Sequence, residues 1–338
     1  MSQPQSFTEL RALVVGLGSI GGRHLANLRR LGCQRLGVLR VHRQLPLPPT
    51  ANLEGVTLHV EIEEALAQGY DVVFIANPTH LHLDFALPAA RAGCHIFMEK
   101  PLSNSMEGVE TLAHEVANRR LKLQMGCQLR FHPGLRAIKT WLAEDRIGDP
   151  VRALVEVGQY LPDWQPWRDY RTSYAARREM GGGVVLTLIH EIDYAQWLLG
   201  PLKALATLGG VSGELEVCAE DHVTSLLSTT YGAGVVLSLD YLQRPPCRRL
   251  KILGGKGLME WDYSSGLASL TQEGRLVARF EPPAGWLAND LYLDLTQDFL
   301  RAVVEDVSPA IPLEDGAAAL ELALAMKAQL QKGQKLLV

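Results

Sequence analysis

Two segments of the chain carry side chains that can move a proton. Lys100 stands between Glu99 and Pro101 at the end of an apolar, strand-like run. A lysine in that position can approach a substrate hydroxyl or carbonyl and exchange a proton with it. Pro101 biases the backbone of Lys100 toward an extended conformation. The competing interpretation is a surface lysine paired with Glu99, and the pair alone does not decide between the two.

The second proton-moving candidate is His190, because histidine titrates near neutral pH. The triple glycine 181–183 gives a flexible entry to a predicted helix over 184–199, and His190 falls about two turns into it. A structural role in the helix is the alternative. Glu191 and Asp193 nearby suggest a metal, but their spacing does not converge on one helical face. We therefore expect no metal site here.

A glycine-rich turn near the N-terminus predicts a dinucleotide site. Gly16, Gly18 and Gly21 satisfy the pattern G-x-G-x-x-G between an apolar strand-like run and a helix. The first glycine allows a tight turn, the second lets the backbone approach a pyrophosphate, and the third permits close helix packing. Ser19 and Ile20 complete the turn, whose amides face the phosphates. A purely structural turn is the alternative.

Polar residues after two other predicted strands extend this candidate cofactor site. Asn77 and Pro78 follow the fourth predicted strand, residues 71–76, and should line the ribose and nicotinamide end, together with Glu99 and Lys100. His82 belongs to the same group, although it could instead cap the following helix. Arg40 ends the second predicted strand, residues 36–40, where an Asp would bind an adenosine 2′-hydroxyl. Arg40 favours a 2′-phosphate and hence NADP, unless it only stacks on adenine.

Bulk composition limits the class of protein. The chain has 338 residues, a hydrophobic content of 47% and a formal net charge of −4. Two domains are expected at this length, and the charge gives no basic surface for nucleic acid. We expect no membrane span and no signal peptide. The five cysteines are scattered and contain no C-x-x-C, which favours free thiols in a cytoplasmic protein.

The elements that must position these residues fall into two groups. Residues 1–125 alternate strand and helix patterns, and their short apolar strands predict a doubly wound parallel sheet, a Rossmann domain. Residues 126–338 read as long strands with tight turns plus helices at 184–199, 291–304 and 316–332. This pattern predicts an α+β domain with a large, mostly antiparallel sheet. Ligands of the first domain should bind at the carboxyl ends of its strands.

Taken in order, these motifs resemble the Gfo/Idh/MocA oxidoreductases over essentially the full length. The motifs that carry the resemblance are the glycine turn with His24, the segments 78–82, 92–102, 128–133 and 181–193, and Gly254 to Gly257. The segment 160–170 resembles a subgroup associated with bacterial surface-sugar pathways. The resemblance implies hydride transfer between NAD(P) and a carbinol or carbonyl carbon of a sugar, nucleotide sugar or cyclitol. It also implies that Lys100 and His190 are the catalytic residues.

The same resemblance assigns Arg130, Arg168, Tyr170 and Thr187 to substrate binding. One departure bears on the mechanism: many relatives carry an Asp four residues before the histidine, and this chain has Leu186 there. Thr187 is the nearest polar residue. The proton relay is then either shortened or served by Tyr170 or Arg168.

Two other classes of function remain compatible with the residues. One is a catalytically silent sensor that keeps the NAD(P) site, although Lys100 argues against it. The other is a sugar hydrolase or epimerase that uses tightly bound NAD without net redox change. A free face of the second sheet should support a homodimer or homotetramer, as in the family.

Overall fold

The computed structural model describes residues 6–41, 52–166 and 168–334. The N-terminal residues 1–5, on which the expectation of no signal peptide partly depends, lie outside these ranges. The chain folds into two compact units, one of residues 1–128 and 287–317 and one of residues 129–286 and 318–338. The segment 287–317, which the sequence groups with the second domain, therefore belongs to the first unit.

The first unit contains a six-stranded parallel sheet with the order β3-β2-β1-β4-β5-β6. This order and the helices between the strands confirm the predicted Rossmann fold. The apolar strands are buried, as expected for a sheet covered on both faces. The strands are β1 (Arg11–Val15), β2 (Arg35–Leu39), β3 (Thr57–His59), β4 (Val72–Ile75), β5 (His95–Met98) and β6 (Leu123–Met125).

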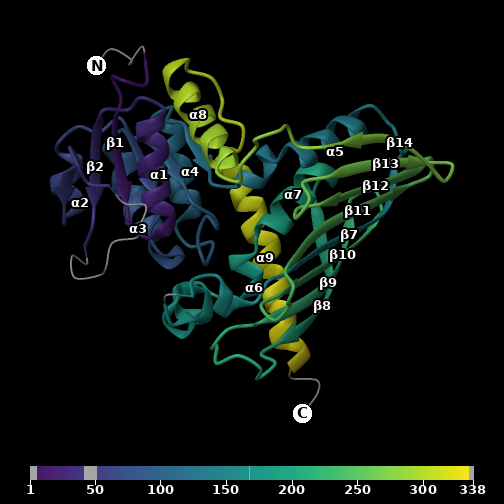
Figure 1. Ribbon diagram of the computed structural model, residues 1–338. Coiled ribbons are helices and arrows are strands. Elements are labelled where there is room, and N and C mark those ends of the chain that lie inside the picture. Colours follow the sequence, from purple (N-terminus) through teal and green to yellow (C-terminus); the bar gives the residue numbers. More distant parts are fainter. Residues whose placement is uncertain (1–5, 42–51, 167, 335–338) are drawn as a thin grey trace. The chain divides into compact units, whose positions relative to one another are not determined.

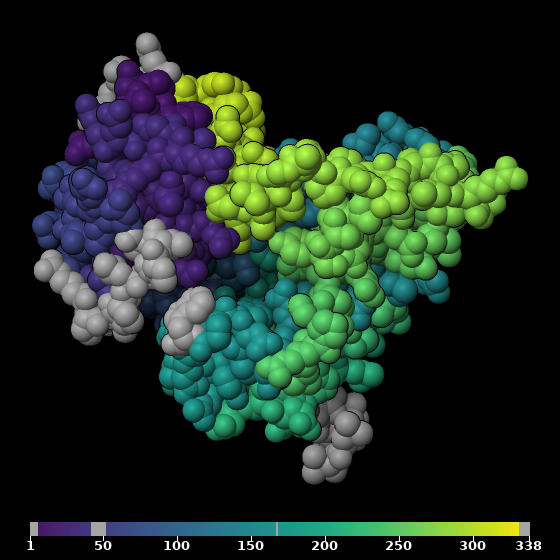
Figure 2. Space-filling view, viewed as in Figure 1, coloured from purple at the N-terminus to yellow at the C-terminus, as the bar shows by residue number. Residues whose placement is uncertain are grey.

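In the described part of the chain, four α-helices connect these strands, and a late helix packs against them. They are α1 (Ser19–Arg30), α2 (Ile62–Leu66), α3 (His82–Arg91), α4 (Val109–Asn118) and α8 (Asp290–Val304). Asn289 donates to Asn27 of α1 at 2.9 Å, and Phe299 packs on Phe74 and Phe97. Figure 2 shows the yellow-green atoms of this segment against the purple N-terminal part. These contacts are the reason that α8 belongs to the first unit.

The second unit is built on an eight-stranded sheet with the order β14-β13-β12-β11-β7-β10-β9-β8. Only β7 and β10 pair in parallel among its described strands, so the predicted mostly antiparallel sheet is confirmed. The strands are β7 (Pro150–Gly158), β8 (Leu202–Gly210), β9 (His222–Thr229), β10 (Gly234–Asp240), β11 (Cys247–Gly254), β12 (Gly257–Asp262), β13 (Ala268–Gln272) and β14 (Arg275–Phe280).

Helices lie along one face of this sheet (Figure 1). They are α5 (Pro133–Ala143), α6 (Val184–Thr187), α7 (His190–Leu199) and the part of α9 (Leu313–Gln334) within this unit. Burial alternates along β9 and β10, so one face forms the core and the other faces outward. Helix α5 and strand β13 were not predicted from the sequence. None of the described helices combines the length and apolarity that crossing a membrane requires.

The single helix predicted over 184–199 is wrong. Leu188, with φ −98° and ψ 30°, leaves the helical conformation and ends α6, and α7 begins at His190. The break contains no glycine or proline, and the residues on either side of it are buried. The apolar pattern therefore continues across the break and hides it. His190 consequently starts a helix instead of lying two turns inside one.

Candidate functional site

The carboxyl edge of the parallel sheet gathers the predicted cofactor residues. Val15 of β1 is in register with Ile75 of β4, which is in register with Met98 of β5. The glycine turn, Asn77 and Lys100 follow these three strands directly, so all three leave the sheet at one level. Strand order reverses between β1 and β4, and ligands of such sheets bind in that crevice.

The glycine turn has the geometry that a pyrophosphate needs. Gly16 has φ +88°, and a Cβ there would lie 2.8 Å from the backbone nitrogen of Asn77. A Cβ on Gly21 would lie 2.0 Å from the carbonyl oxygen of Gly16, whereas a Cβ on Gly18 would meet nothing within 4 Å. The N-terminus of α1 at Gly18 has no side-chain cap. Its first-turn amides, with the open space beside Gly18, fit a phosphate group.

Two side chains near this turn hold polar atoms that lack a hydrogen-bond partner in the described part of the chain. Both side-chain polar atoms of Asn77 are shielded from solvent and find no hydrogen-bond partner among the described residues. The Nη2 atom of Arg40, at the end of β2, is in the same situation. Buried polar groups are normally hydrogen-bonded, so these atoms fit a dinucleotide that would supply the missing partners.

His82 joins the loops that follow β4 and β5. Its Nδ1 lies 2.8 Å from the carbonyl oxygen of Pro101, and its Nε2 lies 3.0 Å from that of Asn77. Burial lowers the pKa of His82, so the ring is neutral and donates to one of the two carbonyls at a time. The side chain thus bridges the loops on either side of the candidate site, and it does not cap helix α3.

Glu99 and Lys100 are held differently. The Glu99 carboxylate is buried and accepts from His24 of α1. Lys100 is partly exposed, follows Glu99 at the end of β5, and its peptide bond to Pro101 is cis. In the sequence, His24 stands out only as part of the family pattern. Its contact with Glu99 spans 75 residues and exists only in three dimensions.

In the second unit, His190 begins α7 and is buried. The two acidic residues that follow it are engaged by arginines. Glu191 accepts from Arg248 of β11 at 2.7 Å, and Asp193 accepts from Arg130 at 2.7 Å and 3.0 Å. These carboxylates anchor α7. No cluster of His, Cys, Asp or Glu suited to a metal ion occurs within the described ranges.

The other predicted substrate residues are distributed over two places in this unit. Thr187 is buried in α6. Burial raises the pKa of Tyr241 well above its usual value, and a hydrogen bond with Thr187 opposes that shift. Arg168 and Tyr170 lie in the loop between β7 and α6, which contains the short turns η3 (Leu161–Asp163), η4 (Tyr170–Thr172), η5 (Tyr174–Ala176) and η6 (Arg178–Met180).

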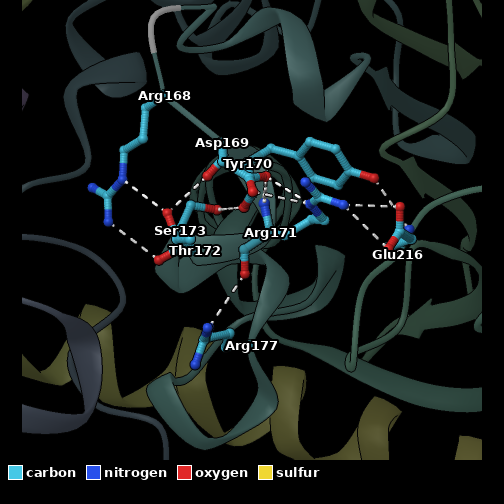
Figure 3. Close-up of polar contacts among 8 residues, drawn as sticks. All are labelled: Arg168, Asp169, Tyr170, Arg171, Thr172, Ser173, Arg177 and Glu216. Atoms are coloured by element: carbon cyan, nitrogen blue, oxygen red, sulfur yellow. Dashed lines mark hydrogen bonds and ion pairs between the residues drawn. The ribbon is translucent and has the colours of Figure 1, made fainter.

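Charges in this loop are mostly compensated. Arg171 pairs with Asp169 at 2.9 Å and with Glu216 at 3.2 Å, and the Tyr170 hydroxyl accepts from the backbone of Glu216. Arg168 instead donates to Thr172, to the hydroxyl at 3.3 Å and the carbonyl at 3.2 Å. Figure 3 shows Arg168 on one side of the turn and the Arg171–Glu216 contacts on the other. The Arg168 cation is thus oriented by neutral oxygens.

One residue set escaped the sequence analysis. Glu220 packs on Gly183, where a Cβ would lie 2.5 Å from its carboxyl carbon, and it pairs with Lys327 of α9 at 2.7 Å. Gly183 also has φ +100°. Glycine at 183 is therefore required for this close approach, which lies just before α6 and the helix α7 that begins at His190. No sequence spacing links residues 220 and 327 to it.

The parallel sheet, the glycine turn and the lysine at its carboxyl edge define a nicotinamide-dinucleotide-dependent oxidoreductase. Residues 10–127 match the model of the oxidoreductase family with an NAD-binding Rossmann fold, and residues 135–260 match the GFO/IDH/MocA C-terminal domain. The chain belongs to the Gfo/Idh/MocA family.

Several relatives match most of the chain. Myo-inositol 2-dehydrogenase of Thermotoga maritima is 25% identical over 333 residues, which is 96% of this chain and 97% of that protein. The structure of levoglucosan dehydrogenase with NADH and levoglucosan superposes with a TM-score of 0.84 at 20% identity, covering 96% and 97% of the two chains. The WlbA dehydrogenase of Bordetella pertussis, with NADH and UDP-GlcNAcA, gives 0.79 at 21% identity over 96% and 97%.

Proposed function

We propose that this oxidoreductase transfers a hydride between a nicotinamide cofactor and a carbinol or carbonyl carbon of a sugar, nucleotide sugar or cyclitol. The observation that carries the proposal is that β1, β4 and β5 end in register, which brings the glycine turn, Asn77 and Lys100 to the same edge of the sheet. The substrates named for relatives, an inositol, levoglucosan and a UDP-sugar acid, support the substrate class.

Lys100 and His190 carry the proton transfer in this proposal. When bound, the nicotinamide ring accepts or gives the hydride at C4. During oxidation of an alcohol, Lys100 removes the hydroxyl proton as the carbinol hydrogen leaves as hydride, and His190 assists. Reduction of the carbonyl runs the same transfers in reverse. Leu186 is apolar and buried, so the relay does not pass through that position.

The remaining predicted residues bind the cofactor and the substrate. Arg168 and Tyr170 contact the substrate, and Arg168 suits an anionic substituent because its hydrogen bonds go to neutral oxygens. Arg130 and Thr187 act on the substrate-binding region indirectly. Arg130 does so through its buried contact with Asp193, and Thr187 through its buried position in α6. The residues proposed to hold the dinucleotide are Gly16, Gly18, Ser19, Ile20, Gly21, Arg40, Asn77, Pro78, His82, Glu99 and Lys100.

The cofactor preference is proposed to lean toward NADP. The support is the shielded Nη2 of Arg40 at the end of β2, which has no partner among the described residues and to which a 2′-phosphate would provide an acceptor.

All five cysteines are free thiols, which supports the expected cytoplasmic location.

A second copy of the chain is the proposed partner of the open sheet face. Leu154 of β7, Val236 of β10 and Leu226 of β9 are cross-strand neighbours on that face, and Leu154 is 37% and Leu226 46% exposed. Apolar rows of this kind mark association surfaces. Leu226→Glu should convert a dimer or tetramer to monomers in light scattering, whereas Thr140→Glu, at an exposed position of α5 on the helix-covered side of the sheet, should not.

The function is tested by titrating the protein with NADH and NADPH, followed by assays on a panel of sugars, nucleotide sugars and inositols. Lys100→Met should abolish turnover with little change in cofactor affinity. Lys256→Met, at an exposed lysine paired with Asp145, is the matched control. Full activity of the Lys100 variant would overturn the assignment. Cofactor binding without turnover would indicate a sensor, and substrate conversion without net NAD(P)H change would indicate a hydrolase or epimerase.

A further inference from the structure

A buried hydrogen bond joins helix α1 to the residue before Lys100. Nε2 of His24 lies 2.7 Å from Oε1 of Glu99, and the two residues are 0% and 7% exposed. The carboxylate oxygen accepts in this contact, so Nε2 of His24 is the donor. The second oxygen of Glu99, Oε2, accepts from the backbone N–H of Lys100 at 3.3 Å. Glu99 therefore connects α1 to the main chain of Lys100.

The surroundings of this pair keep it in one arrangement. The His24 ring packs against Phe74, with ring centroids 5.4 Å apart, and against Phe97 at 4.9 Å. A polar ring among aromatic side chains is unfavourable unless it is hydrogen-bonded, so the bond to Glu99 is strongly preferred. On the other side, a Cβ at Gly126 would come within 3.0 Å of the Glu99 carboxyl group. Glycine at 126 leaves the space that the carboxylate needs.

The position of His24 in α1 indicates that the His24–Glu99 pair has a role beyond packing. The first turn of α1, from Ser19 to Gly21, is where the dinucleotide phosphates are proposed to bind, and His24 lies about one turn further along. The helix that receives the phosphates thus also fixes the residue next to Lys100. A histidine that only filled space would not need a buried carboxylate as its partner.

We propose that His24 is a positioning residue for proton transfer, which holds the Glu99 carboxylate so that the main chain at Lys100 is fixed relative to the phosphate-binding helix. This inference rests on the proposed role of Lys100. It assigns His24 no contact with the cofactor or the substrate. Its effect passes through Glu99.

The first test separates turnover from binding. His24→Leu keeps a side chain of similar bulk but removes the donor, and it should lower kcat about 10- to 100-fold, because small displacements of a reacting group have effects of this size. The Kd for NADH should stay within about twofold of wild type. His24→Gln can donate from its amide and should recover most of the turnover. His95→Gln, at the start of β5 and so at the end of this strand away from Glu99, is the control for a histidine substitution that does not touch the Glu99 carboxylate.

A double-mutant cycle tests whether His24 acts through Glu99. If it does, His24→Leu should reduce kcat much less in a Glu99→Gln background than in wild type. Additive effects of the two substitutions would overturn the proposal. So would a His24→Leu enzyme with wild-type kcat, or a His24→Gln enzyme as impaired as the leucine variant.

A measurement without substrate separates this inference from the proposed function. Acetylation of Lys100 in the NADH-bound protein is followed by mass spectrometry of the peptide that contains it. His24→Leu and Glu99→Gln should change the rate at least about twofold, because the main chain at Lys100 is no longer fixed, whereas His24→Gln and His95→Gln should match wild type. Unchanged rates in all variants would refute positioning by His24. A wild type without hydride transfer to any substrate would refute the proposed function while leaving this measurement decisive.

Discussion

Arg130 donates two hydrogen bonds to Asp193, one from Nε at 3.0 Å and one from Nη2 at 2.7 Å, and both side chains are nearly inaccessible to solvent. Asp193 stands three residues after His190 on α7, so the pair fixes the helix that presents His190. The guanidinium edge that faces Asp193 is fully used by this contact. This geometry favours an anchoring role for Arg130 over direct recognition of the substrate.

Removing one member of this pair should be costly. Arg130→Met or Asp193→Asn each leaves a buried partner uncompensated, and we expect a loss of about 3–5 kcal/mol in the free energy of unfolding. Combining Arg130→Met with Asp193→Leu should recover much of that loss. Urea denaturation measures the effect. The exposed Arg244–Asp163 pair is the control, and Arg244→Ala should change stability little. Single variants as stable as this control would contradict the anchoring role.

Arg40 should decide cofactor preference. Arg40→Ser removes the charge that would face a 2′-phosphate, so the Kd for NADPH should rise about 10- to 100-fold, as expected for a hydrogen bond to a charged group. The Kd for NADH should hardly change. Fluorescence titration measures both constants, with Arg35→Ser at the opposite end of β2 as the control. An equal loss for both cofactors would instead indicate stacking on adenine.

Arg168 should set the affinity for anionic substrates. Arg168→Gln should raise KM for a sugar that bears a carboxylate or phosphate and leave KM for a neutral sugar unchanged. Its kcat should change little, because Arg168 is proposed to contribute binding and not proton transfer. Arg171→Gln is the neighbouring control, since Asp169 and Glu216 already pair with that arginine. Identical KM values for wild type and the Arg168 variant on every substrate would exclude this role.

Acid should destabilise the second unit through His132. Its Nδ1 accepts from the backbone of Gly134 at 3.0 Å and faces Trp261 Nε1 at 3.3 Å. Burial, and then the nearby Arg248 charge, lower the pKa of His132 to about 4. The folded protein therefore binds this proton less readily than the unfolded chain, whose pKa is near 6.5. The stability contribution is complete above pH 6.5 and is lost as pH falls toward 4.

The size of this effect is about 3 kcal/mol over that interval, since one pKa unit corresponds to about 1.4 kcal/mol. Urea denaturation between pH 7.5 and 4.5 should show the slope, and His132→Asn should flatten it. His114→Asn, at an exposed histidine, should keep the wild-type slope. An unchanged slope in the His132 variant would show that other groups, such as the buried His82 and the half-buried His95, account for the acid sensitivity.

Local rules are sufficient to predict the parallel sheet, the glycine turn and the position of Lys100. Apolar runs form buried strands, Gly16 must adopt a positive φ, and residues that follow parallel strands share one edge. Such signals lie within a few residues of each other and can be read without knowing the fold.

Which distant groups meet depends on the tertiary structure. His24 and Glu99, Arg130 and Asp193, and Glu220 and Lys327 are 75, 63 and 107 residues apart, and no spacing rule connects them. The break between α6 and α7 and the return of α8 to the first unit also depend on packing partners elsewhere in the chain. Residue type and local spacing identify the side chains that can do chemistry, whereas burial and long-range hydrogen bonds determine how each side chain is held.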